Sequence, residues 1–141
     1  MNILFKKRNQ GFTLVEILLV VVIIGALSAM IIPRLTGRSE QAKVVAAKAD
    51  INSHIATALK LYELDNGFFP TTDQGLDALL KKPVASPAPL NWNGPYIERK
   101  PLDPWGNVYR YASPGRHRPD YDLYSDGKDT SSQEDDITNW E

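Results

Sequence analysis

Residues 12–32, FTLVEILLVVVIIGALSAMII, decide the fold of this chain. They form about 20 residues of nearly unbroken apolar sequence, which is the length that a helix needs to cross a bilayer. The basic residues ahead of them, Lys-Lys-Arg at 6–8, are expected to stay in the cytoplasm, which would place the rest of the chain across the membrane. The stretch therefore predicts one membrane-spanning helix, and a plain membrane anchor is the simplest function for it.

Glu16 is the only charged residue in the apolar stretch. A carboxylate there costs about 2.5 to 3.5 kcal/mol on insertion scales, so it needs a partner. If a protease cut after Gly11, Phe12 would expose a cationic α-amine that could meet Glu16 of a neighbouring subunit. At low dielectric this attraction would offset much of the insertion cost and set the register between subunits. A stray acid neutralised by protonation is the alternative.

Gly11-Phe12-Thr13-Leu14-Val15-Glu16 resembles the cleavage and methylation motif of the type IV pilin and pseudopilin superfamily. The resemblance implies that a prepilin peptidase cuts between Gly11 and Phe12 and N-methylates Phe12, and that Glu16 docks subunits during assembly. It also implies that the chain has three parts. Residues 1–11 are a cleaved cationic leader, residues 12–32 a transmembrane helix that becomes the filament core, and residues 33–141 a periplasmic pilin-like head with a C-terminal calcium loop.

The pattern after the apolar stretch predicts a small head on a long helix. Pro33 should kink or loosen the helix, but an apolar stripe that includes Val45 continues to about Leu64, and Gly67 closes it. Residues 74–82 read as a short helix, a proline-rich loop follows, and alternation at 107–112 and 121–125 predicts short antiparallel strands. The prediction is an α+β fold: a long N-terminal helix, membrane-spanning in its first half, packed on a head with a short helix, that loop and a small antiparallel sheet.

The motifs of the head resemble the major pseudopilins of type II secretion systems. They include Asn66-Gly67-Phe68-Phe69-Pro70-Thr71, Gly94-Pro95-Tyr96 and Asp103-Pro104-Trp105-Gly106-Asn107. Each motif alone is ordinary turn chemistry. Adhesive type IV major pilins usually carry a larger sheet and a C-terminal disulfide loop, which a chain without cysteine cannot form.

The resemblance implies a structural subunit rather than an enzyme. Such a subunit waits in the bacterial inner membrane, single-pass with its head in the periplasm, until an assembly platform and its ATPase extract it from the lipid. It then forms a homopolymer, with minor pseudopilins, whose periplasmic filament drives export of folded proteins across the outer membrane. A type IV pilin of a surface fibre and an anchored calcium-binding module that never polymerises are the alternatives.

An acidic loop near the C-terminus, residues 123–136, gathers several carboxylates. From spacing alone, a solvated loop and a Ca²⁺ site both remain open, whereas zinc is disfavoured without Cys or paired His. The resemblance implies structural calcium, because this loop binds calcium in the major pseudopilins. It assigns the ligands to Asp126, Asp135, Asp136 and the carbonyl of Leu123.

Other functions have little support in the sequence. The formal net charge is -1, with basic residues at 6–8 and eight acidic residues between Asp120 and Glu141. This asymmetry argues against nucleic acid as a partner, because phosphate binding needs clustered Lys and Arg on a folded face. No motif of a serine hydrolase, a zinc protease or a phosphate-binding loop occurs. His54 is interpreted as structural and His117 as an exposed residue of the turn region at 114–119, and Asp120 and Asp122 are a carboxylate pair only in spacing.

Overall fold

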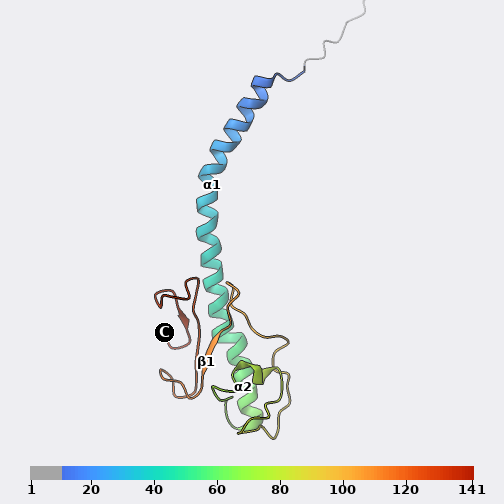
Figure 1. Cartoon of the computed structure of the whole chain (residues 1–141), viewed down its shortest axis with the longest axis vertical. Coiled ribbons are helices and arrows are strands. Elements are labelled where there is room, and N and C mark those ends of the chain that lie inside the picture. Colours follow the sequence, from blue (N-terminus) through green and yellow to red (C-terminus); the bar gives the residue numbers. More distant parts are fainter. Residues whose placement is uncertain (1–10) are drawn as a thin grey trace, which may run out of the picture. The chain divides into compact units, whose positions relative to one another are not determined.

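The computed structural model describes the backbone of residues 11–141 and their side chains, except those of residues 31–36. Figure 1 shows the order of its elements along the chain. They are α1 (Leu14–Ala49), the π-helix η1 (Asp50–His54), α2 (Ile55–Asn66), the 3-10 helix η2 (Leu76–Leu79), β1 (Arg110–Ala112), β2 (Asp122–Ser125) and β3 (Ile137–Thr138). The predicted α+β class is confirmed. The leader lies outside the described residues except for Gly11.

The chain divides into two compact units, Met1–Ser39 and Glu40–Glu141. The first unit contains the N-terminal part of α1. Thr13 caps this helix, because its Oγ1 accepts a hydrogen bond from the backbone N–H of Glu16 at 3.2 Å. Among the described residues, no helix combines the length and the hydropathy that crossing a membrane requires.

A helical spine runs through the second unit, which we call the head. The five-residue π-helix η1 joins α1 to α2, and nothing in the sequence pattern predicts it. It shifts the buried face of the spine: Ala47 and Ile51 are fully buried, whereas Val45, predicted to lie on the apolar stripe, is 65% exposed. The prediction for Val45 is wrong because a π-turn is wider than an α-turn and moves the stripe around the helix axis.

The spine ends where the sequence predicts. Gly67 follows Asn66, the last residue of α2, and its N–H donates a hydrogen bond to the carbonyl oxygen of Glu63 at 2.7 Å. The next predicted helix, at residues 74–82, is only the short η2 of four residues, because 3-10 turns have poorer hydrogen-bond geometry and rarely run longer.

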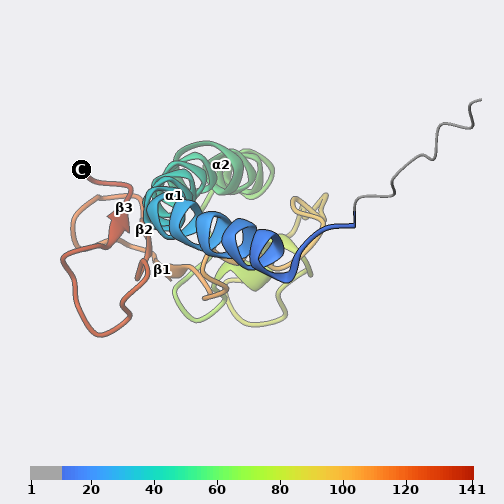
Figure 2. The same ribbon diagram turned by 90° about the horizontal axis from the view of Figure 1, so that it is seen from above.

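Three short strands form an antiparallel sheet in the order β1-β2-β3. Arg110 pairs with Tyr124 and Ala112 with Asp122, so β1 and β2 confirm the predicted strands, although β1 is shorter than the predicted 107–112. β3 was not predicted, because two residues are too few for an alternating pattern. Figures 1 and 2 place the C-terminus beside this sheet.

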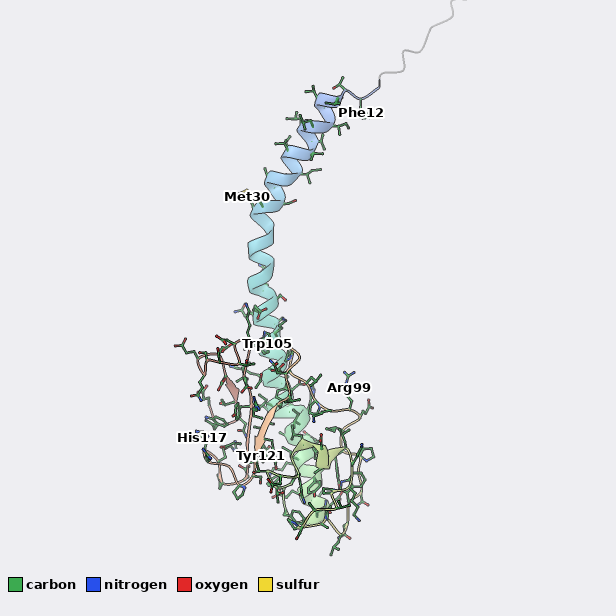
Figure 3. The ribbon with its side chains drawn as sticks, in the orientation of Figure 1. Phe12, Met30, Arg99, Trp105, His117 and Tyr121 are labelled. Carbon is green, nitrogen blue, oxygen red and sulfur yellow. The ribbon has the colours of Figure 1, made fainter. Side chains whose placement is uncertain are left out.

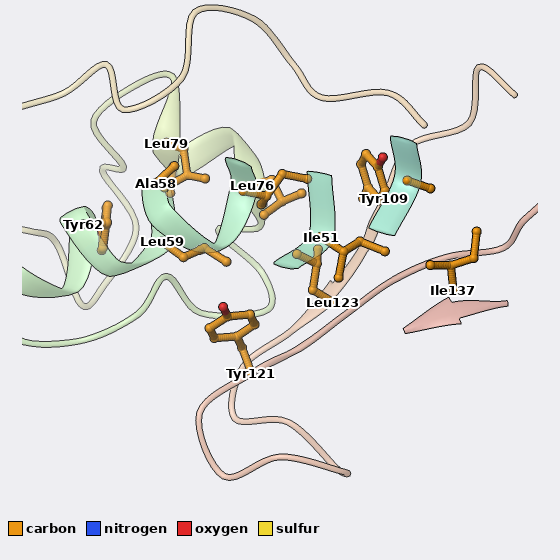
Figure 4. Packing of buried hydrophobic residues seen from close by; sticks show 13 residues of the cluster. Ile51, Ala58, Leu59, Tyr62, Leu76, Leu79, Tyr109, Tyr121, Leu123 and Ile137 are labelled. Carbon is orange, nitrogen blue, oxygen red and sulfur yellow. The ribbon is translucent and has the colours of Figure 1, made fainter. Parts of the chain in front are cut away.

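The core of the head lies between the spine, η2 and the sheet. Figure 4 shows Leu123 of β2 directed toward Ile51 of η1, and both side chains are fully buried. The buried cluster comprises Ala47, Ile51, Ile55, Ala58, Leu59, Tyr62, Leu76, Ala78, Leu79, Tyr109, Tyr121, Leu123 and Ile137. These few side chains must stabilise the whole head, so each fully buried one contributes a large share of its stability.

Two aromatic side chains fix the proline-rich loop to this core. The Trp92 indole N–H donates a hydrogen bond to the carbonyl oxygen of Ala78 at 2.9 Å. The Tyr96 hydroxyl donates a hydrogen bond to the carboxylate of Asp65 at 2.7 Å. The loop therefore has a defined path over the helices although it contains no strand.

Candidate functional site

The predicted processing and assembly residues lie together at the beginning of α1. Gly11 and Phe12 precede the helix in non-helical, exposed chain, and Phe12 is 81% exposed. Such backbone is open to a protease. Glu16 lies in the first turn of α1, where the helix dipole favours a negative charge. Figure 3 shows Phe12 at this end of the helix.

The first unit presents apolar side chains to its surroundings on every face of the helix. Its large hydrophobic side chains from Phe12 to Met30 are all at least 46% exposed within the single chain. An apolar surface of this extent is typical of a site that contacts protein or membrane. The segment can therefore bury this surface in lipid or against copies of the same helix.

The second predicted site is the acidic loop, and the structure brings only some of its residues together. Asp126 and Asp136 both line a hollow of about 770 Å³ on the C-terminal side of the head. Asp126 accepts a hydrogen bond from Arg110 Nε at 2.9 Å. The Leu123 carbonyl oxygen accepts one from the N–H of Asn139 at 3.1 Å, within the pairing of β2 with the end of the chain.

Asp135 is turned toward the backbone of its own loop. Its Oδ2 accepts hydrogen bonds from the N–H groups of Lys128 at 2.8 Å and Asp129 at 3.0 Å. Its Oδ1 is buried and has no hydrogen-bond partner among the residues that the structure describes. A buried carboxylate oxygen without a partner is costly, so this atom is a candidate for a cation.

Gly127 shapes the turn that brings Asp135 close to Asp126. Its φ of +65° lies in the left-handed region, and a Cβ at this position would come within 2.5 Å of the Asp135 carbonyl oxygen. Any larger residue would therefore strain the turn and push the two ends of the loop apart.

Like charges meet in this loop. Burial raises the pKa of Asp136 above its ordinary value, and the neighbouring carboxylates of Asp126, Asp135 and Glu141 raise it further. A divalent cation would relieve this repulsion, and oxygen ligands of this kind suit Ca²⁺. The donor chemistry thus fits calcium. Even so, no three His, Cys, Asp or Glu side chains in the described part of the chain are arranged as a metal cluster.

The structure also shows an organising carboxylate that sequence reasoning missed. Asp103 is 4% exposed, and its Oδ1 accepts hydrogen bonds from the N–H groups of Trp105 at 3.0 Å and Asn107 at 2.8 Å. Its Oδ2 accepts one from the Ser125 hydroxyl at 2.6 Å. The Asp-Pro-Trp-Gly-Asn sequence predicts the turn, but not that its aspartate also fixes the end of β2.

The Trp105 side chain fixes the same turn to the spine. Its indole N–H donates a hydrogen bond to Glu40 at 2.9 Å, and this contact lowers the pKa of the Glu40 carboxyl below its ordinary value. The ammonium of Lys43 lies 5.9 Å from the centre of the indole ring. Figure 3 shows Trp105 beside the helix at this level of the head.

The remaining titratable candidates do not form a reactive constellation in the structure. Asp120 pairs with the Arg118 guanidinium at 3.1 Å, whereas Asp122 is buried under a turn, so the two carboxylates serve separate contacts. His54 pairs with Asp50 at 2.7 Å. His117 stacks on Trp140, with the ring centres 4.1 Å apart.

Comparisons with known proteins agree with this architecture. The family model "Type II secretion system (T2SS), protein G" matches residues 34–140, and the model "Prokaryotic N-terminal methylation motif" matches residues 6–32. The type II secretion system core protein G of Pseudomonas aeruginosa is 50% identical over 141 residues, which cover 96% of this chain and 98% of that protein. The protein of the same name from Escherichia coli K12 is 47% identical over 135 residues, and this match covers 94% of this chain and 92% of that protein.

A solved structure gives the same result. The crystal structure of the major pseudopilin from the type 2 secretion system of enterohaemorrhagic Escherichia coli matches with a TM-score of 0.66 at 38% identity. The match covers 75% of this chain and 89% of that one. The predicted family is confirmed: the chain belongs to the type II secretion system protein G family.

Proposed function

We propose that this chain is the structural subunit that polymerises into the periplasmic pseudopilus of a type II secretion system. As the filament grows, it drives the export of folded proteins across the outer membrane. The family consists of structural subunits rather than enzymes, and we propose no catalytic role.

The observation that carries this proposal is the exposed apolar surface of the first unit, joined to a methylation motif. Leu14 is 82% exposed and Met30 is 73% exposed. Exposing apolar side chains of this size to water is unfavourable, so lipid or protein is expected to cover them. In the proposed cycle, lipid covers them before assembly and neighbouring helices cover them in the filament. The head has a buried core of its own between its helices and sheet, and none of the described residues of the first unit belongs to it.

The proposal assigns the N-terminal residues their roles. A prepilin peptidase cuts between Gly11 and Phe12 and methylates the new amine of Phe12. Glu16 then docks each subunit against the amine of its neighbour. Until that step the chain is a single-pass protein of the inner membrane with its head in the periplasm, and a platform protein with its ATPase transfers it into the filament beside minor pseudopilins.

Two measurements test this function. Deleting the gene should abolish the secretion of exoproteins, and the wild-type gene should restore it. Purified filaments should consist of this chain beginning at Phe12. Normal secretion in the deletion strain, together with loss of surface fibres, would instead identify a type IV pilin. A mature chain that retains residues 1–11 and never polymerises would identify a membrane anchor.

We further propose that the acidic loop binds one structural Ca²⁺ ion through Asp126, Asp135, Asp136 and the carbonyl of Leu123. Two observations support this proposal. Asp135 Oδ1 has no hydrogen-bond partner in the described part of the chain, and the pKa of Asp136 is raised by its burial and by repulsion from the neighbouring carboxylates. The ion would bind the folded head selectively and so stabilise it by mass action.

A matched pair of variants tests the calcium proposal. Asp136→Asn removes a charge from the repelling cluster, so the chelated head should melt at a higher temperature than wild type, but calcium should no longer raise the melting temperature. Glu134→Gln, an exposed acid of the same loop, should keep the calcium response. If excess chelator leaves the wild-type melting temperature unchanged, the loop does not bind structural calcium.

A further inference from the structure

A tight turn encloses the buried carboxylate of Asp122. The N–H groups of Arg116, His117 and Arg118 all donate hydrogen bonds to it, at 2.7, 3.0 and 3.0 Å. His117 Nδ1 lies a further 3.0 Å from Asp122 Oδ2. Burial alone would raise the pKa of Asp122, but these donors outweigh it and lower the pKa below its ordinary value. The carboxylate therefore fixes the turn and, through Nδ1, the orientation of the His117 ring.

The close fit of this turn depends on Gly115. A Cβ at that position would come within 2.4 Å of the Arg118 carbonyl oxygen and 2.5 Å of Asp122 Oδ1. Real Cβ atoms do not approach neighbours so closely, so a side chain there would open the turn. Gly115 thus allows the backbone to close around the carboxylate.

The oriented His117 ring contacts the end of the chain. Its ring stacks on that of Trp140 with an interplanar angle of 8°, and Trp140 also meets Tyr124 edge to face at 5.6 Å. Such aromatic pairs contribute beyond the apolar area that they bury. Figure 3 shows His117 on the C-terminal side of the head.

Asn139 extends the pairing of β3 with β2 by one residue, through its backbone N–H and its side chain. Its Oδ1 accepts a hydrogen bond from the Leu123 N–H at 3.0 Å, and its Nδ2 donates one to the Tyr121 carbonyl oxygen at 3.1 Å. Its own carbonyl oxygen accepts one from the Arg118 guanidinium at 3.1 Å. Asn139 therefore connects the turn, β2 and the chain end.

We propose that His117, Asp122, Asn139 and Trp140 form a C-terminal clasp, which keeps the chain end docked on β2 whether or not the acidic loop holds a cation. None of these four side chains is among the proposed calcium ligands. The loop of residues 126–136 connects β2 to β3, and Asn139 and Trp140 of the clasp follow this loop in the chain. Loss of the cation then frees only the loop, and the chain end stays in place for the cation to rebind.

Hydrogen exchange tests the clasp on the full chain in detergent micelles, with calcium and with excess chelator. In the wild type, chelation should leave the backbone amides of residues 121–125 and 137–140 protected. Exchange of those amides as fast as that of the loop amides in chelator would overturn the proposal. If chelation changes neither region, the calcium proposal fails and the clasp stands.

Substitutions at position 117 separate the clasp from general destabilisation. In chelator, His117→Ala should speed exchange at residues 137–140 about tenfold, because it removes the stacked ring. His117→Phe keeps an aromatic ring and should recover most of that protection. His54→Ala removes the other histidine of the chain, which lies on the spine, and should leave these amides unchanged. Equal exchange in His117→Ala and wild type would refute the clasp, even if Gly115→Ala fails to fold.

Discussion

Leu59 and Leu64 offer a sharp test of where the stability of the head resides. Both are leucines of α2, but Leu59 is fully buried in the core cluster, whereas Leu64 is 80% exposed. Replacing a buried leucine by alanine removes its transfer free energy and leaves a cavity, at a cost of about 2–5 kcal/mol. Replacing the exposed one should change the free energy of unfolding by about 0.5 kcal/mol or less.

The structure places Leu59→Ala near the middle of that range. The side chain is 0% exposed and belongs to the core cluster that Figure 4 shows, so its removal leaves a cavity inside the core. A loss of about 3 kcal/mol corresponds to a fall of roughly 12–24 °C in Tm for a domain of this size. Because small domains have only about 5–15 kcal/mol of stability, the variant should also be less abundant in cells and secrete less exoprotein.

The assay is thermal unfolding of the full chain in detergent, followed by near-ultraviolet circular dichroism of the aromatic core. Leu64→Ala is the control, because it makes the same chemical change on the same helix. Equal falls in Tm for the two variants would refute the assignment of the core to this face of α2. A fall of less than 5 °C for Leu59→Ala would show that the head has stabilising contacts outside this cluster.

Two further predictions concern the turn at Asp103. Asp103→Ala leaves three donors without their acceptor, at about 1–3 kcal/mol each, so urea denaturation should show a loss of at least about 3 kcal/mol. Ser125→Ala should cost less, because it removes one of these three bonds and the bond from the Gly127 N–H, two in all. The lowered pKa of Glu40 means that its contact with Trp105 stabilises the head above the ordinary glutamate pKa of about 4.3 and is lost as the pH falls through the lower folded value. Glu40→Gln keeps an acceptor oxygen that does not titrate, so its urea midpoint should fall less than that of wild type between pH 5 and pH 3; an identical fall would contradict this role.

The sequence predicted the parts of the fold that depend on long or strongly patterned segments. The helical conformation of the apolar stretch, the end of the spine at Asn66 and the pairing of β1 with β2 are confirmed, whereas the membrane crossing stays a prediction. These features follow from local chemistry: helix period, a glycine after the last turn, and alternation around a turn.

The parts that were missed depend on tertiary contacts. Ile51 is fully buried within the π-helix η1, and no local signal in the sequence marks this wider turn. β3 is stabilised by its pairing with β2 and by the side chain of Asn139, which lies just beyond it. Arg110 faces Asp126 only because β1 and β2 pair in their observed register, so a sequence pattern could not show that this proposed ligand has a cationic neighbour.

The comparisons confirm the predicted family but do not test the role of any single residue. The family that assigns roles to Gly11, Phe12 and Glu16 is confirmed. The role of each of these residues remains a proposal. For calcium, Asp126 and Asp136 line one hollow, but the ligand set stays a proposal, because the donor geometry depends on the loop backbone, which spacing does not determine.

The most direct test of the account replaces Glu16 by glutamine in the full chain and measures three quantities in the same strain: leader removal, filament yield and secreted exoprotein. We expect the leader to be removed at Gly11 as in wild type, while filaments and secretion are lost, because the cationic chain end of each neighbour then has no carboxylate to meet in the apolar layer. Wild-type filaments and wild-type secretion from processed Glu16→Gln subunits would contradict the account.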